Sequence, residues 1–168
     1  MKINIDYYSD FKEEIHIKKY NEFLQGYSKK IEKIVKYTLE TNGIIIDEIY
    51  IGMGVVTKEK IKEINNEHRG INKETDVLSF PMFKKNEIEE LKNSDYKKIQ
   101  NEILLGDIVL CIDVIEEQAE EYGTGFHREM LYMITHGICH LLGYDHEGEI
   151  DKKDMREKEE EVLKVVGE

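Results

Sequence analysis

The sequence predicts one α+β domain, a mixed α/β layer fold in which a small mixed sheet of about four strands is packed with about five helices. Two patterns support this prediction. Short segments that alternate apolar and polar residues, or are rich in isoleucine and valine, are separated by longer segments whose apolar residues recur every three or four positions. The 168 residues suffice for one buried core, and no repeat or linker divides them, so we expect a single domain over 1–168.

The N-terminal part of the chain supplies two strands and two helices. Residues 2–8 alternate apolar and polar side chains, as in a half-buried strand. Apolar residues at helical spacing predict a helix over about 18–41, and the isoleucine- and valine-rich residues 44–56 predict a strand. Thr57 is a suitable N-cap for a short helix that ends near Gly70.

A short strand and a charged segment follow. Residues 76–80 predict a strand that is stopped by Pro81, the only proline of the chain. Residues 84–102 are dense in charge and weakly patterned, so we expect a surface insertion and not a second domain. Within it, Ile88 and Leu91 indicate a helical turn.

The C-terminal part continues with one strand and three helices. Residues 103–112 predict the strand and residues 114–122 the first helix. A second helix over 126–142 has apolar residues for the core and carries two histidines. A last helix over about 150–166 has an apolar inner face and a strongly acidic outer face.

The composition is that of a water-soluble globular protein. Apolar residues make up 40% and charged residues 36%, and the apolar runs are far too short to span a bilayer, so no membrane partner is expected. The first residues lack the basic-then-apolar layout of a signal peptide. Two cysteines do not make a disulfide framework, so we expect the reducing cytoplasm.

The net charge of −12 restricts how this chain could bind nucleic acid. Acidic residues outnumber basic ones by 36 to 24, whereas proteins that bind nucleic acid through counterion release usually present a basic face. If RNA is the substrate, the attraction must come from a local patch together with a metal ion. Alternatively, a basic protein partner supplies the docking energy. The charge alone does not separate these routes from an ordinary acidic surface.

Three histidines near the C-terminus predict a zinc site. His136 and His140 are four residues apart and therefore project from one face of a helix. Gly143 allows the helix to stop and the chain to fold back, which brings His146 toward the other two. Three imidazoles with no fourth side-chain ligand describe a catalytic zinc site that keeps one position for water. The alternative is a pair of surface histidines followed by a turn.

Other residues near this motif are weaker candidates. Cys139 projects from a different side of the helix, and we expect a small buried residue and not a fourth ligand. Asp145 either accepts a hydrogen bond from the distal N–H of a ligand or bonds to nearby backbone in the turn. His127, His16 and His68 lack ligand spacing.

Two further residues indicate the chemistry. Zinc proteases with the His-Glu-x-x-His motif use the glutamate as general base, but this chain has Gly137 there, which cannot take a proton. Arg69 closes a predicted helix, and a guanidinium can bind phosphate oxygens bidentately and stabilise charge during phosphoryl transfer. The alternative for Arg69 is a solvated arginine that is favourable at a helix C-terminus.

Four segments together resemble one known family. The histidine motif 136–146 and the segments 65–70, 75–81 and 105–108 occur in that family's order. They closely resemble the bacterial endoribonuclease YbeY family, also called the rRNA maturation factor family. The resemblance extends from about residue 44 to the last helix, and the histidine motif is its most specific part.

The resemblance implies a zinc-dependent, single-strand-specific endoribonuclease that acts in ribosomal RNA processing, notably at the 3′ end of 16S rRNA, and in ribosome quality control. It implies one zinc ion held by His136, His140 and His146, with Arg69 and His136 as the candidate catalytic residues. It also implies ribosomal small-subunit proteins and a ribosome-associated GTPase as partners. We expect Asp76, Ser79 and Asp107 to line or brace the cleft.

Two other functions remain open. A pair of histidines four residues apart with a third histidine also fits a metalloprotease-like zinc hydrolase, although Gly137 argues against it. The third alternative is a non-catalytic ribosome-assembly factor whose zinc mainly stabilises the fold.

Overall fold

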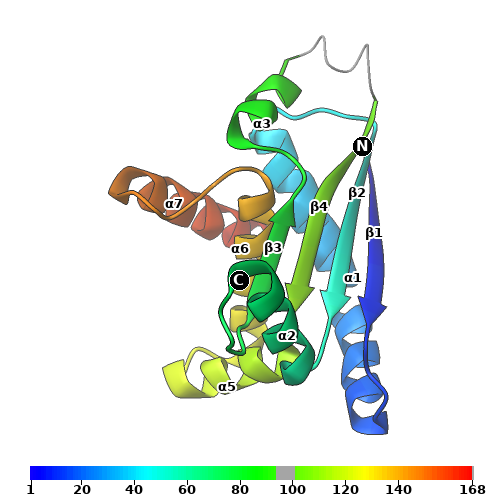
Figure 1. The fold of residues 1–168 in the computed structure, drawn as a ribbon. Helices are drawn as coiled ribbons and strands as arrows, with labels where there is room; N and C mark the ends of the chain where they lie inside the picture. The colour runs from blue at the N-terminus through cyan, green and yellow to red at the C-terminus, as the bar shows by residue number, and fades with distance from the viewer. Residues whose placement is uncertain (94–100, 168) are drawn as a thin grey trace.

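The computed structural model describes residues 1–93 and 101–167. The elements are, in chain order, β1 (Lys2–Ser9), α1 (Glu14–Thr41), β2 (Glu48–Val55), α2 (Lys58–Arg69), β3 (Val77–Pro81), α3 (Lys85–Leu91), β4 (Glu102–Leu110), α5 (Ile112–Tyr122), α6 (Phe126–Leu141) and α7 (Glu149–Val165) (Figure 1). The predicted α+β class is confirmed. Within the described ranges the expected five helices are joined by a sixth, the short α3.

The sheet has four strands in the order β1-β2-β4-β3. Strands β1, β2 and β4 are parallel, and the edge strand β3 runs antiparallel to β4, so the sheet is mixed as predicted. A bulge shifts the register between β2 and β4 after the pair Tyr50–Leu104, where Gly106 has a φ of 148°. No larger residue fits there, because an added Cβ would lie 2.4 Å from the carbonyl oxygen of Phe80.

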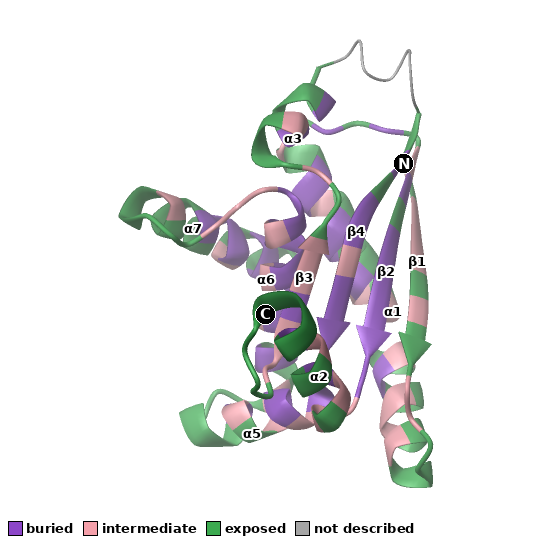
Figure 2. Ribbon diagram, in the orientation of Figure 1, coloured by how far each residue is buried: buried purple, intermediate pink, exposed green. Residues whose placement is uncertain are grey.

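The two faces of the sheet are covered unequally. Helices α1 and α6 pack on one face and form the main core with it, in which the central strands are almost entirely buried (Figures 1 and 2). On the other face, Ile61 of α2 packs on Leu78 and Val109 in a second, smaller cluster. Those two residues alternate along their strands with residues that face the main core. The site lies where α6, α2 and the edge strand meet.

Several predicted boundaries are shifted in the structure. The second strand begins at Glu48 and not at residue 44, because residues 44–47 form the connection from α1, in which Ile44 and Ile46 are nevertheless buried. Pro81 is the last residue of β3 and not the residue that stops the strand. It is tolerated because β3 is an edge strand, where a missing backbone N–H breaks no ladder on the open side.

The charged segment contains more structure than its pattern indicates. The helical turn expected around Ile88 and Leu91 is α3, and both residues are buried in the main core. Residues 94–100 of the predicted insertion 84–102 lie outside the described residues. The single-domain organisation and the role of this segment as an insertion stay predictions.

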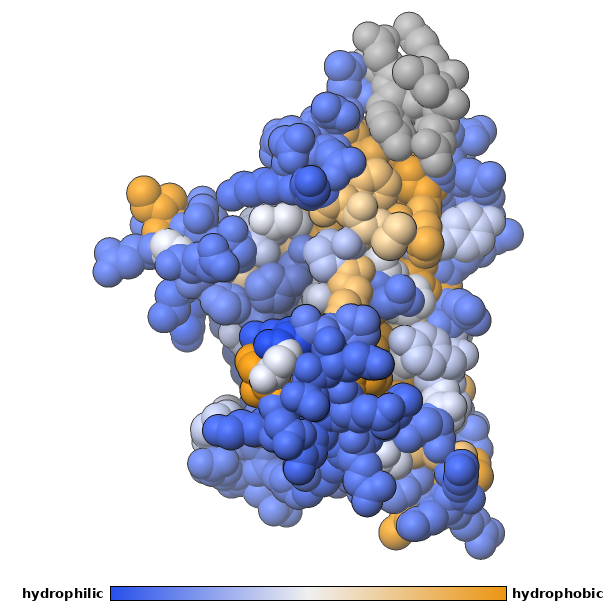
Figure 3. All heavy atoms as spheres, in the orientation of Figure 1, coloured by the Kyte–Doolittle hydropathy of each residue, from blue (hydrophilic) through white to orange (hydrophobic). Residues whose placement is uncertain are grey.

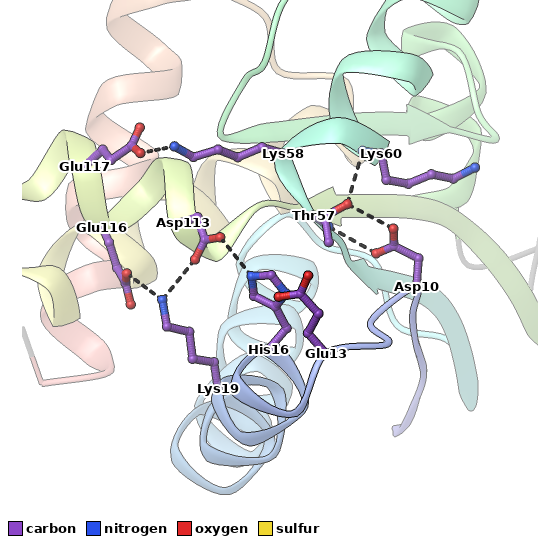
Figure 4. Close-up of polar contacts among 10 residues, drawn as sticks. All are labelled: Asp10, Glu13, His16, Lys19, Thr57, Lys58, Lys60, Asp113, Glu116 and Glu117. Carbon is purple, nitrogen blue, oxygen red and sulfur yellow. Dashed lines mark hydrogen bonds and ion pairs between the residues drawn. The ribbon is translucent and has the colours of Figure 1, made fainter.

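Polar contacts tie together the end of the sheet at which β1 and β2 finish (Figure 4). Asp10 accepts hydrogen bonds from the backbone N–H and the hydroxyl of Thr57, at 3.1 and 3.0 Å. Lys19 of α1 donates to Asp113 and Glu116 of α5, each at 3.0 Å. These contacts hold the loop after β1 against the start of α2, and α1 against the beginning of α5.

The surface agrees with the composition. Figure 3 shows a mostly hydrophilic face, with apolar side chains gathered over the sheet between α2 and α3. Met82 and Leu104 are among the large apolar residues that are exposed. Among the described residues, none of the helices combines the length and the apolar character that crossing a bilayer requires.

Candidate metal centre

The three motif histidines converge in the structure. His136 and His140 lie one turn apart on α6, and their ring centroids are 4.5 Å apart. The helix ends at Leu141, and Gly143 adopts a φ of 86°, which lets the chain turn back. The ring of His146 then lies 5.3 Å from that of His140, and one nitrogen from each of the three rings lies within 4.8 Å of the others.

Neighbouring acceptors fix the protonation pattern of two of the rings. Nδ1 of His136 lies 2.8 Å from a carboxylate oxygen of Glu159, and Nδ1 of His140 lies 3.0 Å from the carbonyl oxygen of Tyr144. A carbonyl oxygen accepts, so Nδ1 of His140 is the donor to Tyr144, and the Glu159 carboxylate oxygen can accept from Nδ1 of His136 in the same way. With Nδ1 as the donor, the Nε2 atom of each ring is left to act as an acceptor or a ligand, and the two Nε2 atoms lie only 3.1 Å apart.

Two ring nitrogens this close to each other suit a shared cation. Two imidazole nitrogens on one tetrahedral zinc, each about 2.0–2.1 Å from the ion, would be about 3.3 Å apart, close to the 3.1 Å found here. Burial, together with the fields of His136 and His146, lowers the pKa of His140 to about 4. His140 is therefore neutral at physiological pH, as a metal ligand must be. The donor set fits a divalent metal ion.

Glu159 of α7 is a site residue that the sequence analysis missed. The sequence predicts an acidic outer face for the last helix, but Glu159 is only 3% exposed. The signal was available, because Glu159 lies four residues after Met155 and four before Leu163, both buried. Its position on the apolar stripe, and not its residue type, identifies it as an inward-facing carboxylate.

Asp145 bonds to nearby backbone in the turn, which is one of the two roles that the sequence left open for it. Its carboxylate accepts a hydrogen bond from the backbone N–H of Glu147 at 3.2 Å, as in a turn. The Nδ1 atoms of His136 and His140 are bound instead by Glu159 and by the Tyr144 carbonyl.

A cleft of about 590 Å³ connects the histidines with the end of α2. It brings together residues that are far apart in the chain, lined by His68, Arg69, Thr75, Asp76, Val77, Leu78, Ser79, Phe80, Pro81, Met133, His136, His140 and His146. Arg69 is the exposed last residue of α2, so its guanidinium is available to an anion in the cleft. His68, which lacks ligand spacing in the sequence, also lines the cleft, and its ring centroid lies 5.0 Å from that of Phe80.

Asp76, Ser79 and Asp107, the residues expected to line or brace the cleft, do not all lie in its lining. Asp76 lines the cleft, and its Oδ1 accepts from the backbone N–H of Val77 at 2.7 Å. Ser79 also lines it and donates to the carbonyl oxygen of Gly137 at 3.3 Å. Asp107 does not itself line the cleft but pairs with Gly52 of β2 and with Phe80 of β3, on the sheet face opposite α6, and its expected role of bracing the cleft stays a prediction.

Gly137 faces the sheet and not the cleft. A Cβ added to it would lie 3.2 Å from Cγ2 of Ile108 and 3.4 Å from Oγ of Ser79. A glutamate would therefore have to enter the packed contact between α6 and the sheet. The protease base is absent from the sequence, and the structure leaves no room for it at this position.

Both cysteines are buried. Cys139 is fully buried and is not one of the three clustered ligands, as expected. Burial raises the pKa of its thiol, and raises that of Cys111 to about 11. His127 lies on another part of α6, where Nδ1 is 3.0 Å from the hydroxyl of Tyr27.

Comparisons with known proteins agree on one family. A family model described as "Endoribonuclease YbeY" matches residues 13–167. A protein named Endoribonuclease YbeY from Caldanaerobacter subterraneus subsp. tengcongensis is 43% identical over 144 residues, which is 84% of this chain and 89% of that protein. One of the same name from Desulforamulus reducens is 44% identical over 139 residues, 83% of this chain and 86% of that protein.

A solved structure has a similar fold. The solution structure of TM1509 from Thermotoga maritima superposes with a TM-score of 0.58 at 28% identity, covering 98% of this chain and 88% of that protein. The similarity of fold therefore extends over almost the whole of the present chain.

Proposed function

This chain belongs to the YbeY endoribonuclease family, and we propose that it cleaves single-stranded ribosomal RNA with a zinc ion held by His136, His140 and His146. Its relatives are RNA-cleaving hydrolases by name. The observation that carries the proposal is the pair of Nε2 atoms of His136 and His140, 3.1 Å apart in the cleft that Arg69 also lines.

A zinc ion at this site and the side chain of Arg69 would divide the chemistry of phosphodiester cleavage between them. A zinc ion bound there would act as a Lewis acid that polarises a phosphoryl oxygen and makes water easier to deprotonate. Arg69 donates to the non-bridging oxygens of the same phosphate and stabilises the charge that develops on them. Because Gly137 cannot act as a base and packs on the sheet, peptide hydrolysis by the glutamate mechanism is not supported.

We assign the substrate as the 3′ end of 16S rRNA, with a role in ribosome quality control, in the cytoplasm. The net charge of −12 disfavours binding to RNA through a broad basic surface. Docking through ribosomal small-subunit proteins and a ribosome-associated GTPase would bring the cleft to its phosphate without such a surface.

The test compares wild type with His136→Ala and Arg69→Glu on a labelled single-stranded RNA, with a duplex of the same sequence as a second substrate. Both variants should lose cleavage by at least about 100-fold, because they remove a metal ligand or a transition-state cation. Arg128→Glu is the matched control, since Arg128 is another exposed arginine and pairs with Glu160 at 3.6 Å outside the cleft. Undiminished cleavage by both site variants would overturn the proposal.

A further inference from the structure

Helix α7 carries a carboxylate into the interior beside the histidine cluster. Glu159 is 3% exposed, and its Oε2 lies 2.8 Å from Nδ1 of His136. The adjacent Lys158 does not neutralise it through a direct contact. The Lys158 ammonium donates instead to the hydroxyl of Thr41 at 2.6 Å and to Glu161 at 3.3 Å. The imidazole is therefore the observed hydrogen-bond partner of the Glu159 carboxylate.

A buried carboxylate needs strong compensation. Removing an ionised group from water is costly unless it is hydrogen-bonded and paired with positive charge. The N–H of a neutral imidazole compensates only in part. When the opposite nitrogen of the ring binds a divalent cation, that N–H becomes more strongly polarised, and its hydrogen bond to a carboxylate strengthens. The environment of Glu159 thus matches a metal-bound ring better than a metal-free one.

The hydrogen bond also selects the useful form of His136. With Nδ1 protonated and held by Glu159, Nε2 is left with its lone pair facing Nε2 of His140. On its other side the ring stacks against Tyr132, with centroids 6.2 Å apart and planes at 21°. Rotation of His136 would break both contacts, so its orientation is set before any ion binds.

The chain path makes this support a property of the fold. His146, the third histidine, lies in the loop between α6 and α7, and α7 then returns so that Glu159 contacts the first histidine. Met155 and Leu163, one turn before and after Glu159, are buried and hold this part of α7 in place. The helix that follows the last histidine of the motif therefore braces the first.

We propose that Glu159 is a positioning residue that raises the affinity of the three-histidine site for zinc by fixing the tautomer and orientation of His136. This inference rests on the proposed function only for the presence of a metal ion. It makes no use of RNA cleavage. Glu159 does not touch the substrate in this role, and it acts through His136.

The experiment measures zinc binding to metal-free protein by competition with a chromophoric chelator. Glu159→Ala should weaken zinc binding by roughly 10- to 100-fold, the range found when such outer partners are removed. Glu159→Gln keeps an acceptor oxygen but loses the charge, so its affinity should fall between those of the alanine variant and wild type. Glu157→Gln is the matched control, because Glu157 is an exposed residue of the same helix, paired with Lys153 at 3.8 Å.

Two further measurements separate positioning from a merely structural role. The visible absorption of the cobalt-substituted protein should change in both Glu159 variants, because the geometry of the His136 ligand changes. Thermal unfolding of the metal-free variants shows whether α7 is still docked. If Glu159 only fastens α7, the variants will unfold at lower temperature but bind zinc with wild-type affinity and spectrum, which overturns the inference.

RNA cleavage is followed separately in the same samples. A wild type that binds zinc in a Glu159-dependent manner but cleaves no RNA contradicts the proposed function and leaves this inference standing. If the wild type cleaves RNA and Glu159→Ala binds zinc with wild-type affinity, the proposed function stands and this inference is overturned.

Discussion

The hydroxyl of Ser79 donates to the carbonyl oxygen of Gly137 across 3.3 Å, which joins the edge strand β3 to the middle of α6. This contact requires the helix to approach the sheet closely, and the absent side chain of Gly137 permits it. The same glycine therefore serves packing and also separates this centre from that of the glutamate-dependent zinc proteases.

Gly137→Glu should destabilise the protein by more than about 3 kcal/mol, because it crowds Ile108 and buries a carboxylate against the sheet. Gly137→Ala should change the free energy of unfolding by less than about 1 kcal/mol, since the gain in helix propensity offsets the tight contact. Urea unfolding measures both. A fully stable Gly137→Glu variant would show that the helix does not pack as closely as described.

Removal of the metal should leave the protein folded. The main core is built from β2, β4 and most of the helices, with β1 and β3 packed against it, without help from the histidines, so chelation should lower the unfolding temperature and keep a cooperative transition. Readdition of zinc at about 100 times its Kd should restore roughly 2.7 kcal/mol. Loss of the far-ultraviolet circular dichroism on chelation would instead favour the non-catalytic alternative, in which zinc mainly stabilises the fold.

The stability of the metal-free protein should fall as the pH drops from about 6.5 toward 4. Burial lowers the pKa of His140 to about 4 in the folded protein from its ordinary value of 6.5, so the unfolded chain binds the proton more readily. His140 thus contributes stability above pH 6.5 that is lost as the pH falls below that value. Urea titrations at pH 7 and pH 5 measure the loss, and His140→Gln should show a smaller difference between the two.

Neither cysteine should react readily with a thiol reagent at pH 8 in the folded protein. Cys111 and Cys139 are fully buried, and burial raises the pKa of both thiols, so the reactive thiolate is scarce. A colorimetric disulfide reagent should detect fewer than one thiol per chain until denaturant is added, and two afterwards. Rapid reaction of one thiol in the native protein would indicate that α6 or the start of α5 opens.

Much of the site follows from local sequence. The spacing of His136 and His140 places their rings on one helix face whatever surrounds the helix, because the helical repeat alone decides it. Gly143 likewise predicts the turn that carries His146 back, since a left-handed residue is easiest for glycine. The resemblance carried by the motifs extended this to RNA and to Arg69, and the family is confirmed.

Other features depend on contacts that no local pattern encodes. Glu159 is 23 positions from His136, and only the packing of α7 on α6 brings them together. Asp107 lies on the sheet face opposite α6 because the bulge near Gly106 shifts by one residue the alternation that a regular strand would follow. The helical repeat and the left-handed turn are short-range properties of the chain, so the sequence by itself determined that the three histidines come together. Which acid supports them and which lies on the opposite face was decided only by the tertiary structure, because both depend on how separate elements register against each other.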